Sequence, residues 1–558
     1  MRHRTKQQLA VMAITVLAIY FMVFMIAALP LKAIAAPSKT GFLVVAEDRG
    51  FLGNQEIESV ITDFQARYNA CLALVGPERQ GIEDGYRAYI QEAITTLRER
   101  GAEHIVAIPL FVSEAQAVLV QYRDIIERMA DPLPLSWAPA MAESYLTAQI
   151  LLDRVTSLSR RPEQERLVIL GAGAANEADA LRIKKDLERL ARDVTLRFRF
   201  KEITYQVYYD RSAPDHEARN EQVDNVIIRT AAKRGRTLLV PFVIGPKFDQ
   251  RMSMAGWLQR KFAEYDITLG NPVMPHDDIL TWLRASANRH LRPVPERIGV
   301  LIMPHGSTRP YNDGLKRVIA PLKKQYRVEM APGMGDPLIL EQAVRRLEDG
   351  GITHIVFVRM YALKNHMKAR TDYILGLSDE PPKRGHGALP QRIRSSAVFT
   401  TFGGYEESPL IAEILRERIL AISKAPSRET VILLAHGRME DENDRRWREV
   451  MENNIRLIKA ELTQPFRDII AMTLREDWPD KRKEALNKIR QVIEQGNEDN
   501  GRVLIISNRL YGSGPYPRLL EGLEFTLNGQ GLVPHPNITR WLEEGVRMAL
   551  QGLPTDRR

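Results

Sequence analysis

The sequence contains a single cysteine, Cys71, in 558 residues. One thiol excludes an intramolecular disulfide framework, a zinc site built from cysteines and an iron–sulfur cluster. The chain also lacks a basic tail and any nucleic-acid-binding motif, because its formal net charge of +9 is spread along its length. Nucleic acid is therefore not an expected partner, whereas an anionic small molecule is compatible with the charge.

Long uncharged runs are also scarce, with one exception at the N-terminus. Residues 9–31 carry no charge, follow the basic stretch "MRHRTKQQ" and precede the small-residue sequence "KAIAAPS". This pattern fits either a cleaved signal peptide over residues 1–36 or a retained membrane anchor. Both readings predict a periplasmic or otherwise extracytoplasmic location, and an uncleaved segment would hold the chain in the inner membrane.

After residue 38 the chain repeats itself. Four strand-like apolar runs begin near Gly41, Arg166, Arg297 and Thr430, at spacings of 125, 131 and 133 residues. Pro-, Arg- or Ser-rich stretches separate the copies. The repeat predicts four modules, numbered one to four in chain order, over residues 38–160, 161–292, 293–425 and 426–558.

Strand-like and helical patterns alternate within each module. In the third, an apolar run over 298–304 precedes helical patterns over 312–324, 337–349 and 407–422, with strand-like runs between them. Such alternation predicts an α/β fold with a parallel sheet and helices on both faces.

The modules also form pairs. "MPHDDILTWL" ends the second module and "VPHPNITRWL" ends the fourth, while the first and third modules match at a constant offset of 250 residues. The architecture therefore reads as one two-module unit copied once. We expect His276 and His535 to anchor these endings, with Asp278 and Asn537 as helix caps.

Three histidines follow strands. His305 and His436 each end an apolar run and precede a glycine, and His366 follows a second strand of the third module. Ligands of open α/β sheets bind at the carboxyl ends of strands, so His305 and His366 are expected to share an edge. Two imidazoles there can hold a divalent cation, although a histidine after a strand can also be an ordinary hydrogen-bonded loop residue.

The third module resembles the sirohydrochlorin cobaltochelatase and ferrochelatase family, the class II chelatases. It carries "HGSTRPYN" (305–312), "DPLILEQAVRRLEDGG" (336–351) and "HMKARTD" (366–372). The fourth module has "HGRMEDEN" (436–443) but no second histidine. At the first histidine position module one has Glu47 and Asp48 and module two has Ala172, and Gln116 of module one stands opposite His366. Modules one and two therefore look noncatalytic. The resemblance implies tandem flavodoxin-like modules.

The resemblance also implies a function. His305 and His366 would bind the metal and accept pyrrole protons, with His436 as a further metal candidate. Cations near these loops would bind the carboxylates of a tetrapyrrole; they are Arg309, Arg359, Lys364 and Arg370. The metal, Co²⁺ or alternatively Ni²⁺ or Fe²⁺, would be a substrate, and no organic cofactor is expected.

Because the chain looks exported, a second hypothesis stands beside the enzyme. The protein would then bind a metal or a tetrapyrrole outside the cytoplasm without turnover. The sequence leaves open whether the chain forms a homo-oligomer.

Overall fold

The computed structural model describes residues 39–76, 83–245, 253–383 and 388–552. The predicted signal or anchor segment lies outside these residues. Within them, no helix is both long enough and apolar enough to span a bilayer.

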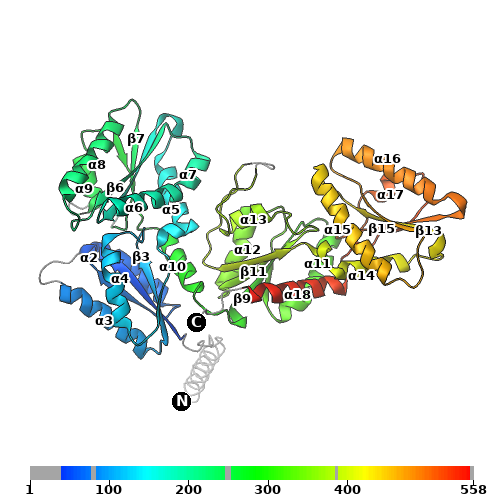
Figure 1. The fold of residues 1–558 in the computed structure, drawn as a ribbon, viewed down its shortest axis with the longest axis horizontal. Coiled ribbons are helices and arrows are strands. Elements are labelled where there is room, and N and C mark those ends of the chain that lie inside the picture. The colour runs from blue at the N-terminus through cyan, green and yellow to red at the C-terminus, as the bar shows by residue number, and fades with distance from the viewer. Residues whose placement is uncertain (1–38, 77–82, 246–252, 384–387, 553–558) are drawn as a thin grey trace, which may run out of the picture.

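The described chain contains four parallel sheets of four strands each (Figure 1). In every sheet the first strand in the chain is central and pairs with the second and third, and the fourth lies at the edge beside the third. The strands are β1 (Thr40–Glu47), β2 (Ala70–Val75), β3 (His104–Leu110), β4 (Leu135–Trp137), β5 (Arg166–Ala174), β6 (Glu202–Tyr209), β7 (Thr237–Pro241), β8 (Ile267–Leu269), β9 (Ile298–Pro304), β10 (Arg327–Met330), β11 (His354–Met360), β12 (Val398–Gly403), β13 (Glu429–Ala435), β14 (Asp468–Thr473), β15 (Arg502–Ser507) and β16 (Thr526–Asn528).

Helices cover both faces of each sheet, as the alternating pattern predicted. The helices are α2 (Gly50–Gln65), α3 (Glu83–Glu99), α4 (Ala117–Ala130), α5 (Tyr145–Leu158), α6 (Glu177–Leu190), α7 (Arg192–Arg197), α8 (His216–Ala231), α9 (Met254–Lys261), α10 (Asp278–Asn288), α11 (Arg309–Ile319), α12 (Pro337–Asp349), α13 (Lys368–Ile374), α14 (Pro409–Leu420), α15 (Asp441–Ala460), α16 (Pro479–Gly496), α17 (Tyr516–Leu519) and α18 (Pro536–Gln551). The predicted fold class, tandem α/β modules with parallel sheets, is confirmed.

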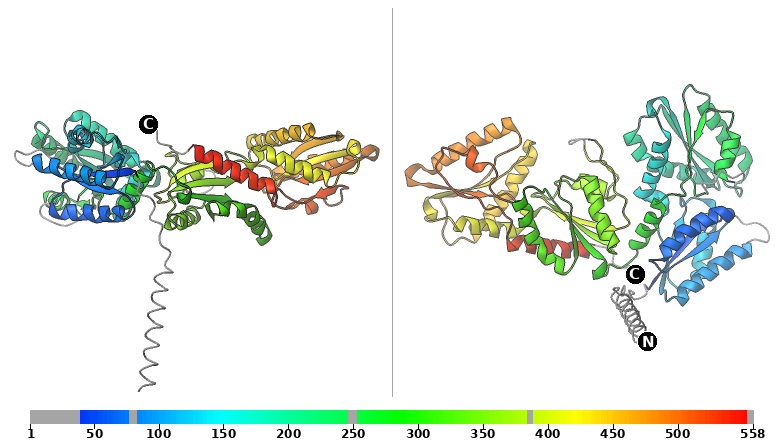
Figure 2. Two further views of the ribbon diagram at one scale, coloured as in Figure 1. Left: turned by 90° about the horizontal axis from the view of Figure 1, so that it is seen from below. Right: turned by 180° about the vertical axis from the view of Figure 1, so that it is seen from behind.

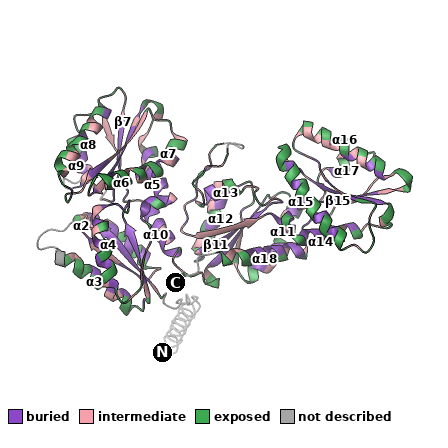
Figure 3. Ribbon diagram, viewed as in Figure 1, coloured by how far each residue is buried: buried purple, intermediate pink, exposed green. Residues whose placement is uncertain are grey.

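Burial explains the continuous apolar runs of the central strands. All seven residues of β9 and all seven of β13 are buried, because each strand has a neighbour on both sides and helices above and below. The sheets are accordingly the most buried part of each module, and the outer faces of the helices are exposed (Figure 3).

Proline sets the bounds of one helix that the sequence placed at 312–324. Helix α11 begins at Arg309 because Pro310 suits the first turn, where no backbone N–H is needed. It ends at Ile319, and a 3-10 turn over Ala320–Lys324 follows, because Pro321 cannot continue the α-helical hydrogen bonds.

The last helix of each module packs against the other module of its pair. Helix α18 lies on β11, β12 and α11 of the third module, while α14 packs against α15 and β15 of the fourth (Figure 1). In the first pair, α10 lies on α2 and β3, and α5 packs against β7. One hydrophobic core is therefore shared between modules one and two, and another between modules three and four.

The two pairs lie side by side (Figure 2) and contact each other through the segment that follows α13. Arg394 forms ion pairs with Asp153 and Asp278, and the side chain of Asn288 donates to the carbonyl oxygen of Ser396 at 2.8 Å. The chain connection between the pairs is thus reinforced by polar contacts.

Candidate metal-binding site

Strands β9 and β11 bring two histidine-bearing loops to one edge of the third sheet. The strands are parallel neighbours, and their last residues, Pro304 and Met360, are paired in register. Adjacent strands lie about 4.8 Å apart, so His305 and the loop from Tyr361 to His366 leave the sheet side by side.

His305 is exposed and its ring orientation is set by its own loop. Its Nδ1 lies 2.8 Å from the carbonyl oxygen of Gly306, which can only accept, so Nδ1 carries the proton. The neutral ring then has its lone pair on Nε2. Gly306 is needed here because its φ is +76° and a Cβ would lie 2.8 Å from Cβ of Pro332.

His366 is half-buried against Tyr361. Their ring centroids are 4.7 Å apart, and the Tyr361 hydroxyl donates to the carbonyl oxygen of Gly333. Burial raises the pKa of Tyr361, so this hydroxyl stays protonated at neutral pH. Met367, the next residue after His366, has a φ of +59°, which bends the loop back toward α13.

A residue of the fourth module reaches His366. Nη1 of Arg438 lies 2.6 Å from Nδ1 of His366. The Arg438 backbone is fixed on both sides: its N–H donates to Asp444, and Nε of Arg475 donates to its carbonyl oxygen. Arg438 was not among the site residues predicted from the sequence. The residue after "HG" is a serine, Ser307, in the third module and an arginine, Arg438, in the fourth, and this difference could have drawn attention to it.

His436 has a different environment from His305. Its Nδ1 lies 3.0 Å from the carbonyl oxygen of Gly437, and its Nε2 lies 3.1 Å from a carboxylate oxygen of Asp477. The edge of its ring meets Trp478. The ring is thus engaged within its own module through both nitrogens.

The four predicted carboxylate-binding cations differ in accessibility. The Arg309 side chain is 93% exposed, and Lys364 is exposed. Arg370 is half-buried and donates to the carbonyl oxygen of Gly335. The Arg359 side chain is only 2% exposed; it donates to Thr401 and to the carbonyl oxygen of Lys364.

Arg359 therefore requires a correction. Its position on β11 directs the guanidinium into the module, where Nη1 and Nη2 both donate to the protein itself and where Asp372 lies 4.0 Å away. A ligand carboxylate cannot reach it in this arrangement, so Arg359 is left out of the candidate site.

Exposed apolar side chains accompany these cations. Met334, Leu338 and Ile339 lie in and just after the loop that joins β10 to α12, and they are 44%, 63% and 39% exposed. The sulfur of Met334 is 3.7 Å from the hydroxyl of Tyr361, whose ring packs on His366, so this loop lies close to the candidate site. Met439, next to Arg438, is also exposed.

Among the described residues, one group of three potential metal-ligand side chains has its ligand atoms close together, and it lies elsewhere. It consists of Asp153, His276 and Asp278. The guanidinium of Arg394 already contacts both carboxylates, at 2.5 and 3.1 Å, and supplies the positive charge that a metal would bring. We read this group as a link between the two pairs.

His276 and His535 have the anchoring role that the sequence predicted, but the caps differ. His535 itself accepts from the backbone N–H of Asn537, and His276 accepts from that of Asp278, each at 3.1 Å. The predictions that Asp278 and Asn537 cap these helices are wrong. The imidazole lies two residues before the N–H, where a capping side chain must lie.

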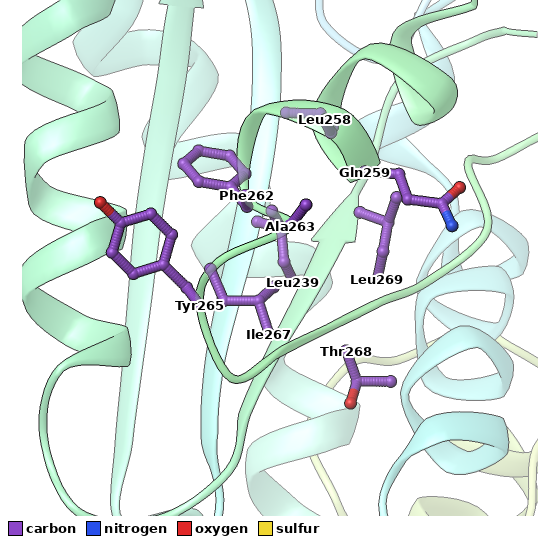
Figure 4. Close-up of a pocket in the computed structure, with 9 residues that line it drawn as sticks. All are labelled: Leu239, Leu258, Gln259, Phe262, Ala263, Tyr265, Ile267, Thr268 and Leu269. Atoms are coloured by element: carbon purple, nitrogen blue, oxygen red, sulfur yellow. The ribbon is translucent and has the colours of Figure 1, made fainter.

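The described residues also line a cavity in the second module (Figure 4). It has a volume of about 440 Å³ and lies between α9 and the edge strand β8. Polar and apolar atoms contribute about equally to its walls, with Gln259, Tyr265 and Thr268 among the lining residues. None of the predicted site residues lines it.

Comparison with known proteins gives a likeness of fold. No protein-family model matches the chain, and no curated protein does. The crystal structure of the sirohydrochlorin chelatase SirB from Bacillus subtilis subspecies spizizenii in complex with cobalt is 13% identical, with a TM-score of 0.32, over 44% of this chain and 93% of that one. SirB from Bacillus subtilis with Fe³⁺ is 16% identical, with a TM-score of 0.34, over 47% of this chain and all of that one.

Proposed function

We propose that the protein is a metal chelatase that inserts a divalent ion into sirohydrochlorin or a related tetrapyrrole. Co²⁺ is the favoured ion, with Ni²⁺ and Fe²⁺ as alternatives. The observation that carries the proposal is the in-register pairing of β9 with β11, which sets His305 and the His366 loop at one edge.

The chemistry requires a metal held by few ligands and a base for the pyrrole protons. The exposed Nε2 of His305 offers a lone pair to an arriving ion. His366 supplies the second imidazole once its contact with Arg438 opens. Neutral imidazoles bind late first-row ions without the tight hold of thiolates, and they accept protons near neutral pH.

The surroundings suit a flat ligand with an anionic rim. Met334, Leu338 and Ile339 present apolar surface beside the site, and Arg309 and Lys364 present charges that solvent can reach. An apolar macrocycle face would pack on the former, and its carboxylates would pair with the latter.

The test is an insertion assay with the full-length protein, sirohydrochlorin and each of the three ions. We expect wild-type protein to accelerate metallation, and the His305→Ala and His366→Ala variants each to lose about a hundredfold or more in rate, the range of general acid–base contributions. His104→Ala is the matched control, since His104 begins β3, the strand of the first module that corresponds to β11, and lies outside the candidate site. Equal rates for wild type and both site variants would refute the proposal.

The non-enzymatic alternative keeps the same site and is favoured by one observation. His366 is engaged by Arg438, so the described arrangement lacks a second open imidazole. A binding protein would take up tetrapyrrole or metal stoichiometrically and release no metallated product. Fractionation of cells that express the full chain tests the extracytoplasmic location, which both hypotheses share.

A further inference from the structure

The contact between Arg438 and His366 determines where the imidazole proton lies. A guanidinium has donors only, so the 2.6 Å contact uses the lone pair of Nδ1. A neutral ring then carries its proton on Nε2. One nitrogen is hydrogen-bonded and the other is protonated, so His366 cannot bind a cation while Arg438 is in place.

His305 differs in this respect. Its Nδ1 is used by the neighbouring carbonyl of Gly306, which leaves the lone pair on Nε2 facing outward. The two histidines of the candidate site are therefore in opposite states: one is ready for a metal and the other is blocked.

Only the end of the Arg438 side chain needs to move to unblock His366. The backbone is held by Asp444, whose side chain is 4% exposed, by Arg475, and by Gly437 with its φ of +89°. The contact can therefore open through rotation about side-chain bonds, without movement of the fourth module.

In the first pair of modules the corresponding segments also lie close together, but neither the histidine nor the arginine is present. Gln116 stands at the position of His366, and a Cβ on Gly173 would lie 3.3 Å from its Nε2. Gly173 corresponds to Gly437, with a φ of +99°, and Ala174 corresponds to Arg438. The pair that lacks the histidine also lacks the arginine, so the two residues occur together.

We propose that Arg438 is a carboxylate-binding residue whose departure from His366 opens the metal site. This inference rests on the proposed function. A carboxylate can take two charge-assisted hydrogen bonds from a guanidinium, which is a stronger interaction than one bond to a neutral imidazole. A carboxylate on the rim of a tetrapyrrole therefore draws Arg438 away, and His366 becomes a ligand after the macrocycle has bound.

The experiment measures Co²⁺ affinity of the full-length protein by calorimetry, without any tetrapyrrole. Arg438→Ala should bind Co²⁺ at least about tenfold more tightly than wild type, because the charge-assisted hydrogen bond that occupies Nδ1 of His366 is lost. The double variant Arg438→Ala/His366→Ala should lose that gain. Arg445→Ala, which removes an exposed charge from the same module, is the matched control and should match wild type.

Two further measurements report the contact itself. Carbethoxylation of His366 by diethyl pyrocarbonate, followed by peptide mass spectrometry, should be faster in Arg438→Ala than in wild type. Zinc uroporphyrin I, which has rim carboxylates but a filled centre, should raise the Co²⁺ affinity of wild type and leave that of Arg438→Ala unchanged.

The outcomes separate this inference from the proposed function. If His366→Ala weakens Co²⁺ binding but Arg438→Ala binds no more tightly than wild type, the role of Arg438 is wrong and the chelatase proposal stands. If zinc uroporphyrin I lowers the Co²⁺ affinity of wild type or leaves it unchanged, the proposal that a rim carboxylate draws Arg438 away from His366 is wrong. If neither His305→Ala nor His366→Ala alters Co²⁺ binding in any background, the chelatase proposal itself fails.

Discussion

Glu406 has a carboxyl group enclosed between the third and fourth modules. The residue is 0% exposed, and its Oε2 accepts from Nε1 of Trp447 at 2.5 Å and from Nδ2 of Asn508 at 3.3 Å. In the described part of the chain, Oε1 of Glu406 and Oδ1 of Asn508 are both buried acceptors that lack a donor. A proton on Oε1 removes the negative charge that an unpaired buried carboxylate oxygen would carry.

The charges around Glu406 agree with a protonated acid. Burial raises its pKa from the ordinary value of 4.5 to about 8. The neighbouring Tyr405 and Tyr516 have pKa values raised by burial, so they are neutral as well. The carboxyl group is thus neutral at neutral pH, as are the tyrosines beside it.

This protonation makes stability depend on pH in a defined direction. Between pH 4.5 and about 8 the folded chain holds a proton that the unfolded chain has lost, so stability falls as pH rises, by up to about 1.4 kcal/mol per pH unit. Glu406→Gln keeps the same donors and acceptors without a titrating proton. Thermal unfolding at pH 5.5 and 8.5 should show a smaller decrease in the apparent midpoint for Glu406→Gln than for wild type. Equal decreases would contradict a protonated Glu406.

At the scale of helices and strands, the sequence predicted what depends on local patterns. Apolar runs such as 298–304 became central strands, and the predicted helix over 337–349 has these bounds in the structure. The edge shared by His305 and His366 followed from strand order. No local pattern encodes contacts between segments far apart in the chain. The position of Arg438 at His366, the burial of Glu406 and the packing of each last helix on the other module of its pair depend on such contacts.

Helix α18, which packs against the third module although it ends the fourth, offers a test of the packing between modules. A Cβ on Gly545 would lie 2.1 Å from Cε2 of Phe402, a side chain of β12 that packs on Trp541. Gly545→Ala gains about 1 kcal/mol in helix propensity but forces Phe402 out of place, at about 1–3 kcal/mol. We expect a net loss of stability and a lower thermal midpoint.

Gly552→Ala is the matched control for α18. A Cβ there would have its nearest neighbour, the carbonyl oxygen of Ala549, at an ordinary 3.5 Å. We expect its midpoint to stay close to that of wild type. If Gly545→Ala is as stable as Gly552→Ala, α18 does not pack tightly against β12.

At the scale of the whole molecule, the two pairs meet around a buried charge. The Arg392 side chain is 2% exposed, lies 3.5 Å from a carboxylate oxygen of Asp193 and stacks on the ring of Tyr373 at 4.3 Å. Asp193 also accepts from Gln149 and Tyr373. In the same contact between the pairs, Arg192 and Glu380 form an ion pair that is largely exposed.

These two ion pairs should respond differently to truncation. Arg392→Ala leaves Asp193 buried without its counter-charge, which typically costs about 3–5 kcal/mol, whereas loss of an exposed pair costs about 0–1 kcal/mol. We therefore expect Arg392→Ala to lower the thermal midpoint and to increase the radius of gyration measured by small-angle X-ray scattering, while Arg192→Ala does neither. The double variant Asp193→Asn/Arg392→Gln removes the unpaired charge and should recover part of the loss. If both single variants behave like wild type, the buried pair does not hold the two pairs of modules together, and their arrangement depends on other contacts, among them those of Arg394 and Asn288.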